Sequence, residues 1–146
     1  MDTNCIFCRI AAGEIPSTKI YENDKVLAFL DISPMERGHT LIVPRRHWAT
    51  MADLPSGDPE TEAVMSEWFR VARLVCKAAI KAFGGGANLL QCNGPAAGQT
   101  VPHLHLHVIP RPGTVETQPS FVSGARAYSS DVEREATAEL LRRYLR

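Results

Sequence analysis

An alternation of imidazole and aliphatic side chains runs through residues 103–109 and predicts a β-strand. Because successive side chains of a strand point to opposite faces, one face receives His103, His105 and His107 and the other Leu104, Leu106 and Val108. In a helix, the same spacing would distribute the imidazoles around the cylinder. Pro102 and Pro110 flank the run. Because proline cannot donate a hydrogen bond to a β-ladder, we expect the strand to lie between them.

Shorter β-rich segments predict four further strands, at residues 19–22, 25–31, 39–44 and 87–92. The first two are joined at Asn23-Asp24, which is typical of a hairpin. Within the second, Val26, Ala28 and Leu30 alternate with Leu27 and Phe29. Residues 31–38 are rich in Pro, Gly and Asp and are expected to form a loop.

A long helix is predicted from Pro59 to Phe83. Asp58 is an N-cap, Pro59 suits the first helical position, and Gly84 begins a run of glycines that ends the helix. Apolar residues recur every three or four positions, at Val64, Trp68, Val71, Val75, Ala78 and Ala82. Further apolar residues, Met65, Phe69 and Leu74, widen this stripe. A partner helix and one broad core face explain the excess equally well.

The remaining segments complete an α+β fold. Residues 5–13 form a short helical turn, and Ser130-Asp131 cap a final helix. With 146 residues, of which 45% are hydrophobic, the chain suits one domain. We therefore expect an antiparallel sheet of about five strands, a long helix and a C-terminal helix. Residues 1–112 are the main domain, 113–129 a loop or linker, and 130–146 the C-terminal helix.

Charge and the N-terminal sequence narrow the classes of partner. The 16 basic and 16 acidic residues balance and are largely dispersed, which argues against binding to a nucleic-acid polymer. The N-terminus lacks a basic segment followed by an apolar one, and no apolar run approaches the about 18 residues that span a bilayer. We expect a cytoplasmic protein without a membrane partner.

The three histidines in one row are candidates for chemistry, because burying them without charge, metal or ligand would be costly. A neutral imidazole can act as a nucleophile near physiological pH. The loop at residues 93–99, just before the row, contains Gly94 and Gly98, whose backbone could approach an anion closely. The side chains of Asn93, Gln99 and Thr100 are donors suited to phosphoryl oxygens.

The four cysteines suggest thiols or metal ligands rather than disulfides. Cys5 and Cys8 form a C-x-x-C pair, which is found in redox dithiols and in zinc sites. Only four residues precede Cys5, too few for the strand that precedes a thioredoxin-like motif. His47 and His103 would complete a Cys₂His₂ set for tetrahedral zinc. The alternative is that both cysteines are packing thiols and that His47 is solvated.

Every position of residues 103–109 matches the motif His-φ-His-φ-His-φ-φ, where φ is apolar. In this motif the sequence closely resembles the histidine triad (HIT) family of nucleotide hydrolases and transferases. The resemblance extends to residues 29–34, 38–44 and 93–101, and covers roughly residues 4–112. It implies a HIT-like fold, a homodimer, and structural zinc at Cys5, Cys8, His47 and His103. It leaves the C-terminal segment outside.

The resemblance also implies roles for individual residues. His105 matches the nucleophile that attacks the α-phosphorus, His107 a residue that contacts phosphate and assists the leaving group, and His39 a residue that orients the row. In the loop after the second strand, Phe29 and Ile32 would flank the base and Asp31 would accept hydrogen bonds from the ribose. Plain core packing explains Phe29 and Ile32 about equally well.

The expected function is hydrolysis or transfer at the α-phosphate of small purine nucleotides, either nucleoside 5′-phosphoramidates or dinucleoside polyphosphates, through a nucleotidyl-histidine intermediate. In the family's sugar-nucleotide transferases the third histidine is Gln, so His107 argues against that branch. The alternative is a zinc-stabilised nucleotide-binding protein with little turnover. A redox dithiol enzyme is a third reading.

Overall fold

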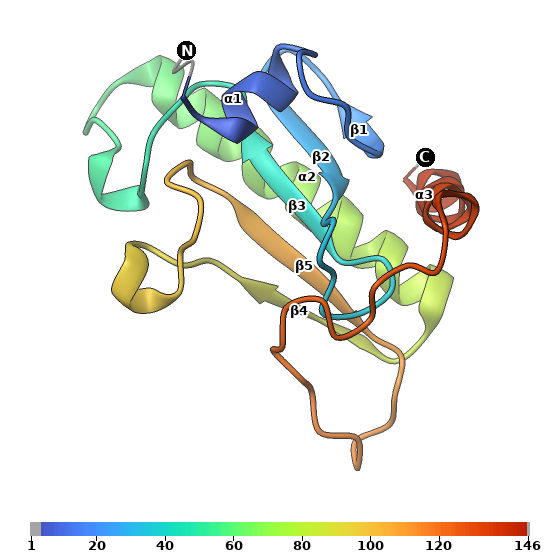
Figure 1. Cartoon of the computed structure of the whole chain (residues 1–146). Coiled ribbons are helices and arrows are strands. Elements are labelled where there is room, and N and C mark those ends of the chain that lie inside the picture. Colours follow the sequence, from blue (N-terminus) through green and yellow to red (C-terminus); the bar gives the residue numbers. More distant parts are fainter. Residues whose placement is uncertain (1–3, 146) are drawn as a thin grey trace.

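Five antiparallel strands form one sheet in the computed structural model, which describes residues 4–145. The strand order is β1-β2-β3-β5-β4 (Figure 1). The strands are β1 (Lys19–Glu22), β2 (Val26–Leu30), β3 (Thr40–Pro44), β4 (Gly86–Leu90) and β5 (Leu106–Arg111). The helices are α1 (Ile6–Ala11), α2 (Pro59–Phe83) and α3 (Asp131–Tyr144), with 3₁₀ turns at Met51–Asp53 and Pro95–Ala97. The expected α+β class, with about five strands, a long helix and a C-terminal helix, is confirmed.

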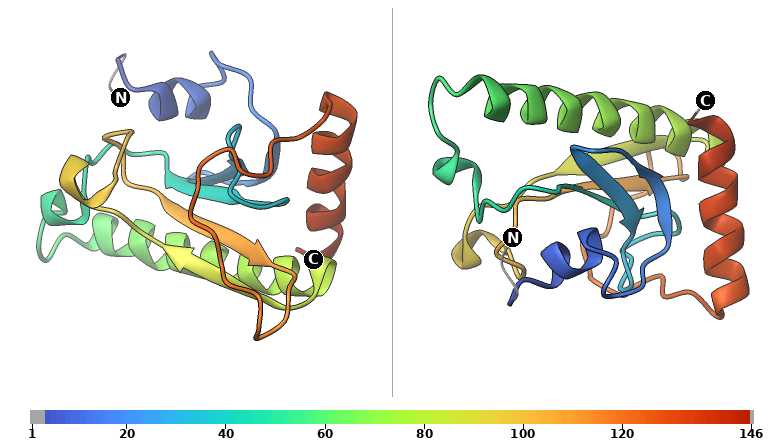
Figure 2. Two further views of the ribbon diagram at one scale, coloured as in Figure 1. Left: turned by 60° about the horizontal axis from the view of Figure 1, so that its bottom comes forward. Right: turned by 90° about the horizontal axis from the view of Figure 1, so that it is seen from above.

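The two faces of the sheet bury separate apolar cores. Figure 2 shows α1 and α2 on opposite faces. On β2, Val26, Ala28 and Leu30 belong to the core beneath α2, whereas Leu27 and Phe29 belong to a second core with residues of α1. The predicted alternation is thus realised, because each face of this strand has its own helix to pack against. On the histidine run, Leu104, Leu106 and Val108 likewise lie in the α2 core.

The long helix α2 has the predicted ends. The side chain of Asp58 accepts a hydrogen bond from the Thr61 backbone N–H at 3.1 Å, as an N-cap should. Val71, Val75 and Ala78 on its inner face are fully buried. Trp68 also donates its indole N–H to the Ile42 carbonyl at 2.8 Å, which satisfies its one polar atom within the core.

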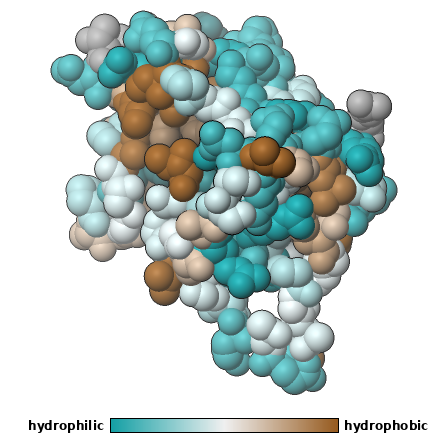
Figure 3. Space-filling view, turned by 45° about the vertical axis from the view of Figure 1, so that its right-hand side comes forward, coloured by the Kyte–Doolittle hydropathy of each residue, from teal (hydrophilic) through white to brown (hydrophobic). Residues whose placement is uncertain are grey.

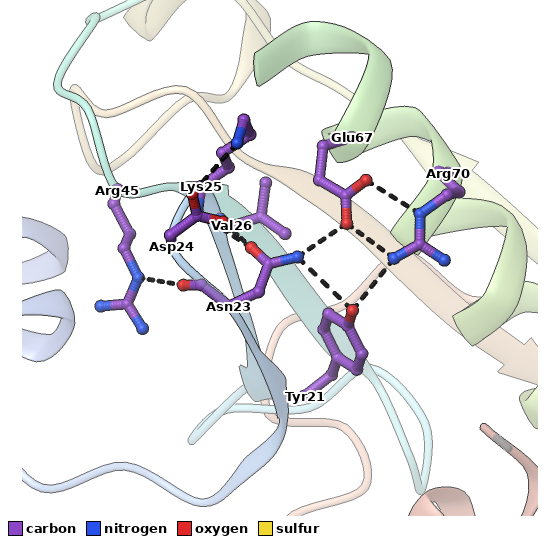
Figure 4. Close-up of polar contacts among 8 residues, drawn as sticks. All are labelled: Tyr21, Asn23, Asp24, Lys25, Val26, Arg45, Glu67 and Arg70. Atoms are coloured by element: carbon purple, nitrogen blue, oxygen red, sulfur yellow. Dashed lines mark hydrogen bonds and ion pairs between the residues drawn. The ribbon is translucent and has the colours of Figure 1, made fainter. Parts of the chain in front are cut away.

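The β1–β2 turn is fastened to α2 by a polar network (Figure 4). The Asn23 side-chain oxygen accepts from the backbone N–H groups of Lys25 and Val26, each at 2.9 Å, and its amide nitrogen donates to Glu67 on α2 at 2.7 Å. Arg70 donates to both Glu67 and Tyr21. The side chain of Asn23 therefore accepts hydrogen bonds from two backbone N–H groups of the turn and also joins the turn to α2.

The histidine and β4 strands differ from their predicted bounds. The β5 strand begins at Leu106 and not at residue 103. Two residues earlier, the backbone N–H of Leu104 donates to the carbonyl of Trp48 and not to β3. The prediction that Pro110 ends the strand is wrong, since β5 continues to Arg111. Pairing with β3 stops at Val108, so one side of β5 is free of a strand where Pro110 lies, and a missing N–H is tolerated there. The β4 strand ends at Leu90, not at residue 92.

The C-terminal segment returns to the sheet. Its helix α3, capped by Ser130 as predicted, buries Ala138 and Leu141 in the α2 core. The loop before it crosses the α1 face of the sheet (Figures 1 and 2). There the N–H groups of Gly124 and Arg126 donate to the carbonyls of Ser33 and Pro34, at 2.9 and 3.1 Å.

The surface drawn in Figure 3 is mostly hydrophilic, with hydrophobic residues gathered in a few brown areas. The loop after β5 projects at the bottom of this view and is mostly pale or teal. Within residues 4–145, no helix has the length and apolar character needed to cross a membrane.

Gly38 precedes β3 at a position that tolerates no side chain. Its φ is +88°, and a Cβ would lie 2.5 Å from the Phe83 ring and 3.1 Å from Pro110. We expect Gly38→Ala to lower the free energy of unfolding by about 2–4 kcal/mol in a urea titration, because positive φ and a steric clash add together. The control Gly13→Ala has a similar φ of +80° but open space around it, and should cost only about 1–2 kcal/mol. Equal losses of unfolding free energy in the two variants would contradict a steric clash at Gly38.

Candidate functional site: a histidine row beside a thiol–imidazole cluster

A cavity of about 340 Å³ opens on the α1 face of the sheet, with His105 and His107 in its wall. Residues of α1, the loop after β2 and the loop before the histidine row complete the wall. Phe7 of α1 packs its ring edge-on against His105, with centroids 5.2 Å apart. The alternation of the histidine run is what delivers both imidazoles to this side, since the aliphatic residues between them occupy the α2 core.

The tautomer of His105 follows from one hydrogen bond. Its Nδ1 lies 2.7 Å from the backbone carbonyl of His103. A carbonyl only accepts, so Nδ1 carries the proton and Nε2 keeps its lone pair. Burial lowers the pKa of His105 below its ordinary value, so the ring is neutral at pH 7. Within residues 4–145 no hydrogen bond occupies Nε2, which leaves it available as a nucleophile.

A chain of hydrogen bonds fixes His39 and His107 in the same way. The Met35 N–H donates to His39 Nδ1 at 3.0 Å, so His39 carries its proton on Nε2. That proton is donated to His107 Nδ1 at 2.8 Å, which leaves His107 with an N–H at Nε2. Burial lowers the pKa of His39 to about 4 and that of His107 to about 3. Both rings are therefore neutral at pH 7, and His107 is a hydrogen-bond donor.

Asp31 lies at the end of this chain. One carboxylate oxygen is 3.6 Å from His39 Nε2, and the other accepts from the Ser33 N–H at 2.8 Å. The ligand atoms of Asp31, His39 and His107 are close enough to hold a metal ion. However, a metal on His39 Nε2 would need the proton on Nδ1, where the Met35 N–H already donates. The three residues therefore suit a hydrogen-bonded chain and not a metal site.

A second cluster lies beside the row and unites Cys5, Cys8, His47 and His103. Their ligand atoms all lie within 4.8 Å of one another. Cys5 Sγ is 3.3 Å from His103 Nδ1, Cys8 Sγ is 3.3 Å from His47 Nδ1, and the two Nδ1 atoms are 3.1 Å apart. Bond lengths of about 2.3 Å to sulfur and 2.0 Å to nitrogen place tetrahedral zinc ligands roughly 3.3–3.8 Å apart. The spacing is thus compatible with zinc.

The orientation of His103 also suits a metal. Its Nε2 lies 2.7 Å from the Pro44 carbonyl, so Nε2 carries the proton and the Nδ1 lone pair faces the two sulfurs. Metal-bound histidines are commonly held by such a bond from the other ring nitrogen. The predicted Cys₂His₂ donors are therefore brought together by the fold, although they come from distant parts of the chain.

A family model described as "HIT domain" matches residues 12–114. The chain belongs to the HIT family. It is 40% identical over 110 residues to adenosine 5′-monophosphoramidase of Schizosaccharomyces pombe, which covers 75% of each chain. It is 41% identical over 112 residues to adenylylsulfatase of Arabidopsis thaliana, covering 76% of this chain and 54% of that protein. A crystal structure of a zinc-bound histidine triad protein from Mycobacterium smegmatis shares 38% identity and covers 97% of this chain and 93% of its own, with a TM-score of 0.79.

Four of the six substrate-binding positions predicted for this HIT protein lie at the 340 Å³ cavity: Phe29, Asp31, Ile32 and Thr100. Phe29 is buried, with its ring in edge contact with Phe7 at 5.6 Å. Ile32 is 81% exposed at the rim. Plain core packing is therefore excluded for Ile32, while Phe29 serves both the second core and the cavity.

The structure does not bring Gln99 or Asn93 into the wall of the cavity. The Gln99 side-chain nitrogen donates to the carbonyls of Ala49 and Val101, and its oxygen accepts from the Gly94 N–H. Because both amide hydrogens bind backbone carbonyls, none is free for a phosphate. The Asn93 oxygen accepts from the Met51 N–H at 2.8 Å. Both side chains instead hold the loop in shape, and of the predicted donors in this region only Thr100 lies in the wall.

The sequence-based prediction missed several residues of the cavity. Phe7 and Ile10 reach it because the cysteine cluster holds α1 over the sheet. Their apolar spacing on a short helix was the only available signal. Ser123, from the C-terminal loop outside the family match, also lies in the wall. No local pattern marks it, since contacts with distant residues, such as the hydrogen bonds to Ser33 and Pro34, place that loop here.

Proposed function

We propose that this HIT protein cleaves small purine nucleotides at the α-phosphate, with His105 as the nucleophile. The observation that carries the proposal is the fixed tautomer of His105, with a free Nε2 at a 340 Å³ cavity. The neighbouring N–H of His107 supplies a donor for phosphate. The names of the two relatives, an adenosine phosphoramidase and an adenylylsulfatase, support a nucleoside with a leaving group on its phosphate.

The proposed reaction has two steps. The Nε2 lone pair of His105 attacks the α-phosphorus, a P–N bond forms, and the bond to the leaving group breaks, with the leaving group taking the electron pair. The imidazole becomes cationic, and its Nδ1–H stays bonded to the His103 carbonyl, which stabilises that charge. Water then attacks the phosphorus, an O–P bond forms, the electron pair of the P–N bond returns to Nε2 of His105, and the proton lost by the water passes to solvent. The His107 N–H contacts the phosphoryl oxygens and assists departure of the leaving group.

Substrate contacts other than the histidines are assigned to the remaining wall residues. Phe29 and Ile32 flank the base, Asp31 accepts from the ribose, and Thr100 donates to phosphate. The Cys₂His₂ cluster would hold structural zinc, because all four ligands come from the protein and none is left for water. Zinc there would stabilise the position of α1 against the histidine row. Unpaired thiols at this cluster also favour a reducing compartment such as the cytoplasm.

The test is a panel of adenosine and guanosine 5′-phosphoramidates, adenylyl sulfate and diadenosine polyphosphates, compared by kcat/KM. We expect turnover of at least one class, with release of the nucleoside monophosphate. Nucleotide binding without turnover of any of these compounds would refute the hydrolase proposal and favour a nucleotide-binding protein.

We also propose that two copies associate through α2 and the edge strand β4. Phe69 and Ile80 on α2 are 64% and 41% exposed, and Leu89 on β4 is 43% exposed. They line one apolar groove of about 580 Å³. An apolar groove next to an unpaired strand edge suits a second copy, which would cover both.

The substitution Ile80→Asp should convert a dimer into a 16.1 kDa monomer at micromolar concentration in sedimentation equilibrium, because it places a charge in the groove. The control Val115→Asp adds the same charge to a loop residue that is 95% exposed, and should leave the dimer unchanged. A wild-type protein that is monomeric at the same concentration would contradict the proposal.

A further inference from the structure

A second and larger cavity, of about 690 Å³, is lined in part by the loop that follows β5. Figure 1 shows this loop projecting beyond the sheet. Its floor includes Asn88 of β4 and Arg111 of β5. Arg111 is four residues beyond His107 on the same strand and therefore faces the same side of the sheet, about 13 Å further along. Met35 lines both this cavity and the histidine cavity, so the two are neighbours.

The guanidinium of Arg111 is held rigidly, yet it is incompletely bonded. Its Nε donates to the side-chain oxygen of Asn88 at 2.8 Å. The Phe121 ring lies against its plane, 4.9 Å from centroid to guanidinium carbon. Nη2 is buried without a hydrogen-bond partner. Among residues 4–145, no carboxylate oxygen lies within 4.0 Å of the Arg111 guanidinium, so Arg111 forms no ion pair there. Arg111 as a whole is half-buried, and a buried N–H group of a cation that lacks an acceptor is costly unless a ligand supplies one.

Three other polar side chains of this cavity, Asn88, Glu36 and Arg126, determine its charge and its free donors near Arg111. The Asn88 oxygen is used by Arg111, so its amide nitrogen is left to donate. Glu36 supplies a carboxylate to the wall, but it already accepts from the Arg126 Nε at 3.1 Å and from the Arg37 N–H at 2.9 Å. Glu36 is thus paired with Arg126, and the lining, with Arg111 and Arg126 against this one carboxylate, carries a net positive charge. A cavity with a net positive lining charge and free N–H groups on Arg111 and Asn88 suits an anion.

We propose that this cavity is a second ligand site, which binds the phosphate or carboxylate group of a small molecule through Arg111 and Asn88. Because Nε of Arg111 is bonded to Asn88, its Nη groups are the ones left to donate to either kind of anion. The site does not depend on the nucleotide chemistry of the histidine row. Its occupant would lie beside Met35, whose N–H orients His39.

Titrations of the 146-residue chain with inorganic phosphate and with citrate would test the site. The protein would first be saturated with AMP to occupy the histidine cavity, and the side-chain N–H signals of Arg111 and Asn88 would be followed by NMR. We expect saturable shifts of both signals with at least one of the two anions. The anion that binds more tightly shows whether phosphate or carboxylate is preferred. Because this readout uses the wild-type chain, it locates the ligand whether or not any nucleotide is hydrolysed.

Two variants with the same loss of charge sharpen the test. Arg111→Gln should lower the affinity for the anion at least tenfold. Arg143→Gln, at an exposed position on α3, should leave this affinity unchanged. Arg111→Lys keeps the charge without the planar fork and should fall between wild type and Arg111→Gln. Saturable binding that is equal in Arg111→Gln, or shifts confined to His105 and His107, would overturn the proposal. So would the absence of saturable shifts up to 50 mM of either anion, roughly the weakest useful affinity for one charged contact.

Discussion

Replacing His105 with asparagine should abolish turnover while nucleotide still binds. The substitution removes the Nε2 lone pair that we assign to attack on phosphorus, and the loss of a nucleophile typically lowers kcat by several powers of ten. Phe29, Asp31, Ile32 and Thr100 remain around the same cavity. The affinity for a nucleoside monophosphate should therefore change by less than about threefold, within the range expected when uniform binding is retained. Stopped assays and calorimetry on the same preparation measure the two quantities.

A control substitution at His107 distinguishes the loss of a nucleophile from the loss of a hydrogen-bond donor. His107→Ala removes an N–H donor and the partner of His39, and should cause a smaller loss, which a better leaving group partly restores. With His105→Asn no leaving group should restore activity. Acid-quench trapping of a nucleotidyl adduct on wild-type protein, absent from His105→Asn, would give direct support. A His105→Asn enzyme that keeps more than about a tenth of wild-type kcat would refute the covalent route.

Removal of zinc should unfold the N-terminal part of the structure, and Cys5→Ser should do the same. Closed Cys₂His₂ sites contribute their binding free energy directly to folding. We expect Cys5→Ser to lower zinc content and the melting temperature together, the latter by more than about 10 °C, which corresponds to a few kcal/mol for a chain of this size. Cys76→Ser is the matched control, because Cys76 lies half-buried on α2, away from the cluster. It should retain zinc and melt within a few degrees of wild type.

Cys5→Ser also tests whether zinc supports the structure or takes part in catalysis. Phe7 and Ile10 line the histidine cavity from α1, which begins between Cys5 and Cys8. Loss of zinc should thus weaken nucleotide binding, unlike His105→Asn, which should spare it. Purified wild-type protein with less than about a tenth of an equivalent of zinc would rule out the site, given how tightly such sites hold metal.

The sequence by itself determined the elements and the two faces of the sheet. The period of two in residues 103–109 assigns the aliphatic residues to one side and the histidines to the other, whatever lies around them. In the same way, Asp58, Pro59 and Gly84 set the ends of α2, because caps act through the local backbone. The family motif could also be read directly from the chain, and with it the identity of the histidines that face the cavity.

The tertiary structure decided which polar groups are free to act. The amide of Gln99 resembles a phosphate donor in the sequence, but carbonyls of Ala49 and Val101 use both of its hydrogens. The protonated nitrogen of His105 depends on the His103 carbonyl, and that of His39 on the Met35 N–H. The buried, unbonded Nη2 of Arg111 likewise depends on the tertiary structure, in which Phe121 of the C-terminal loop packs on the guanidinium. Periodicity and capping are properties of neighbouring residues, whereas hydrogen-bond partners are set by segments that meet only in the folded chain.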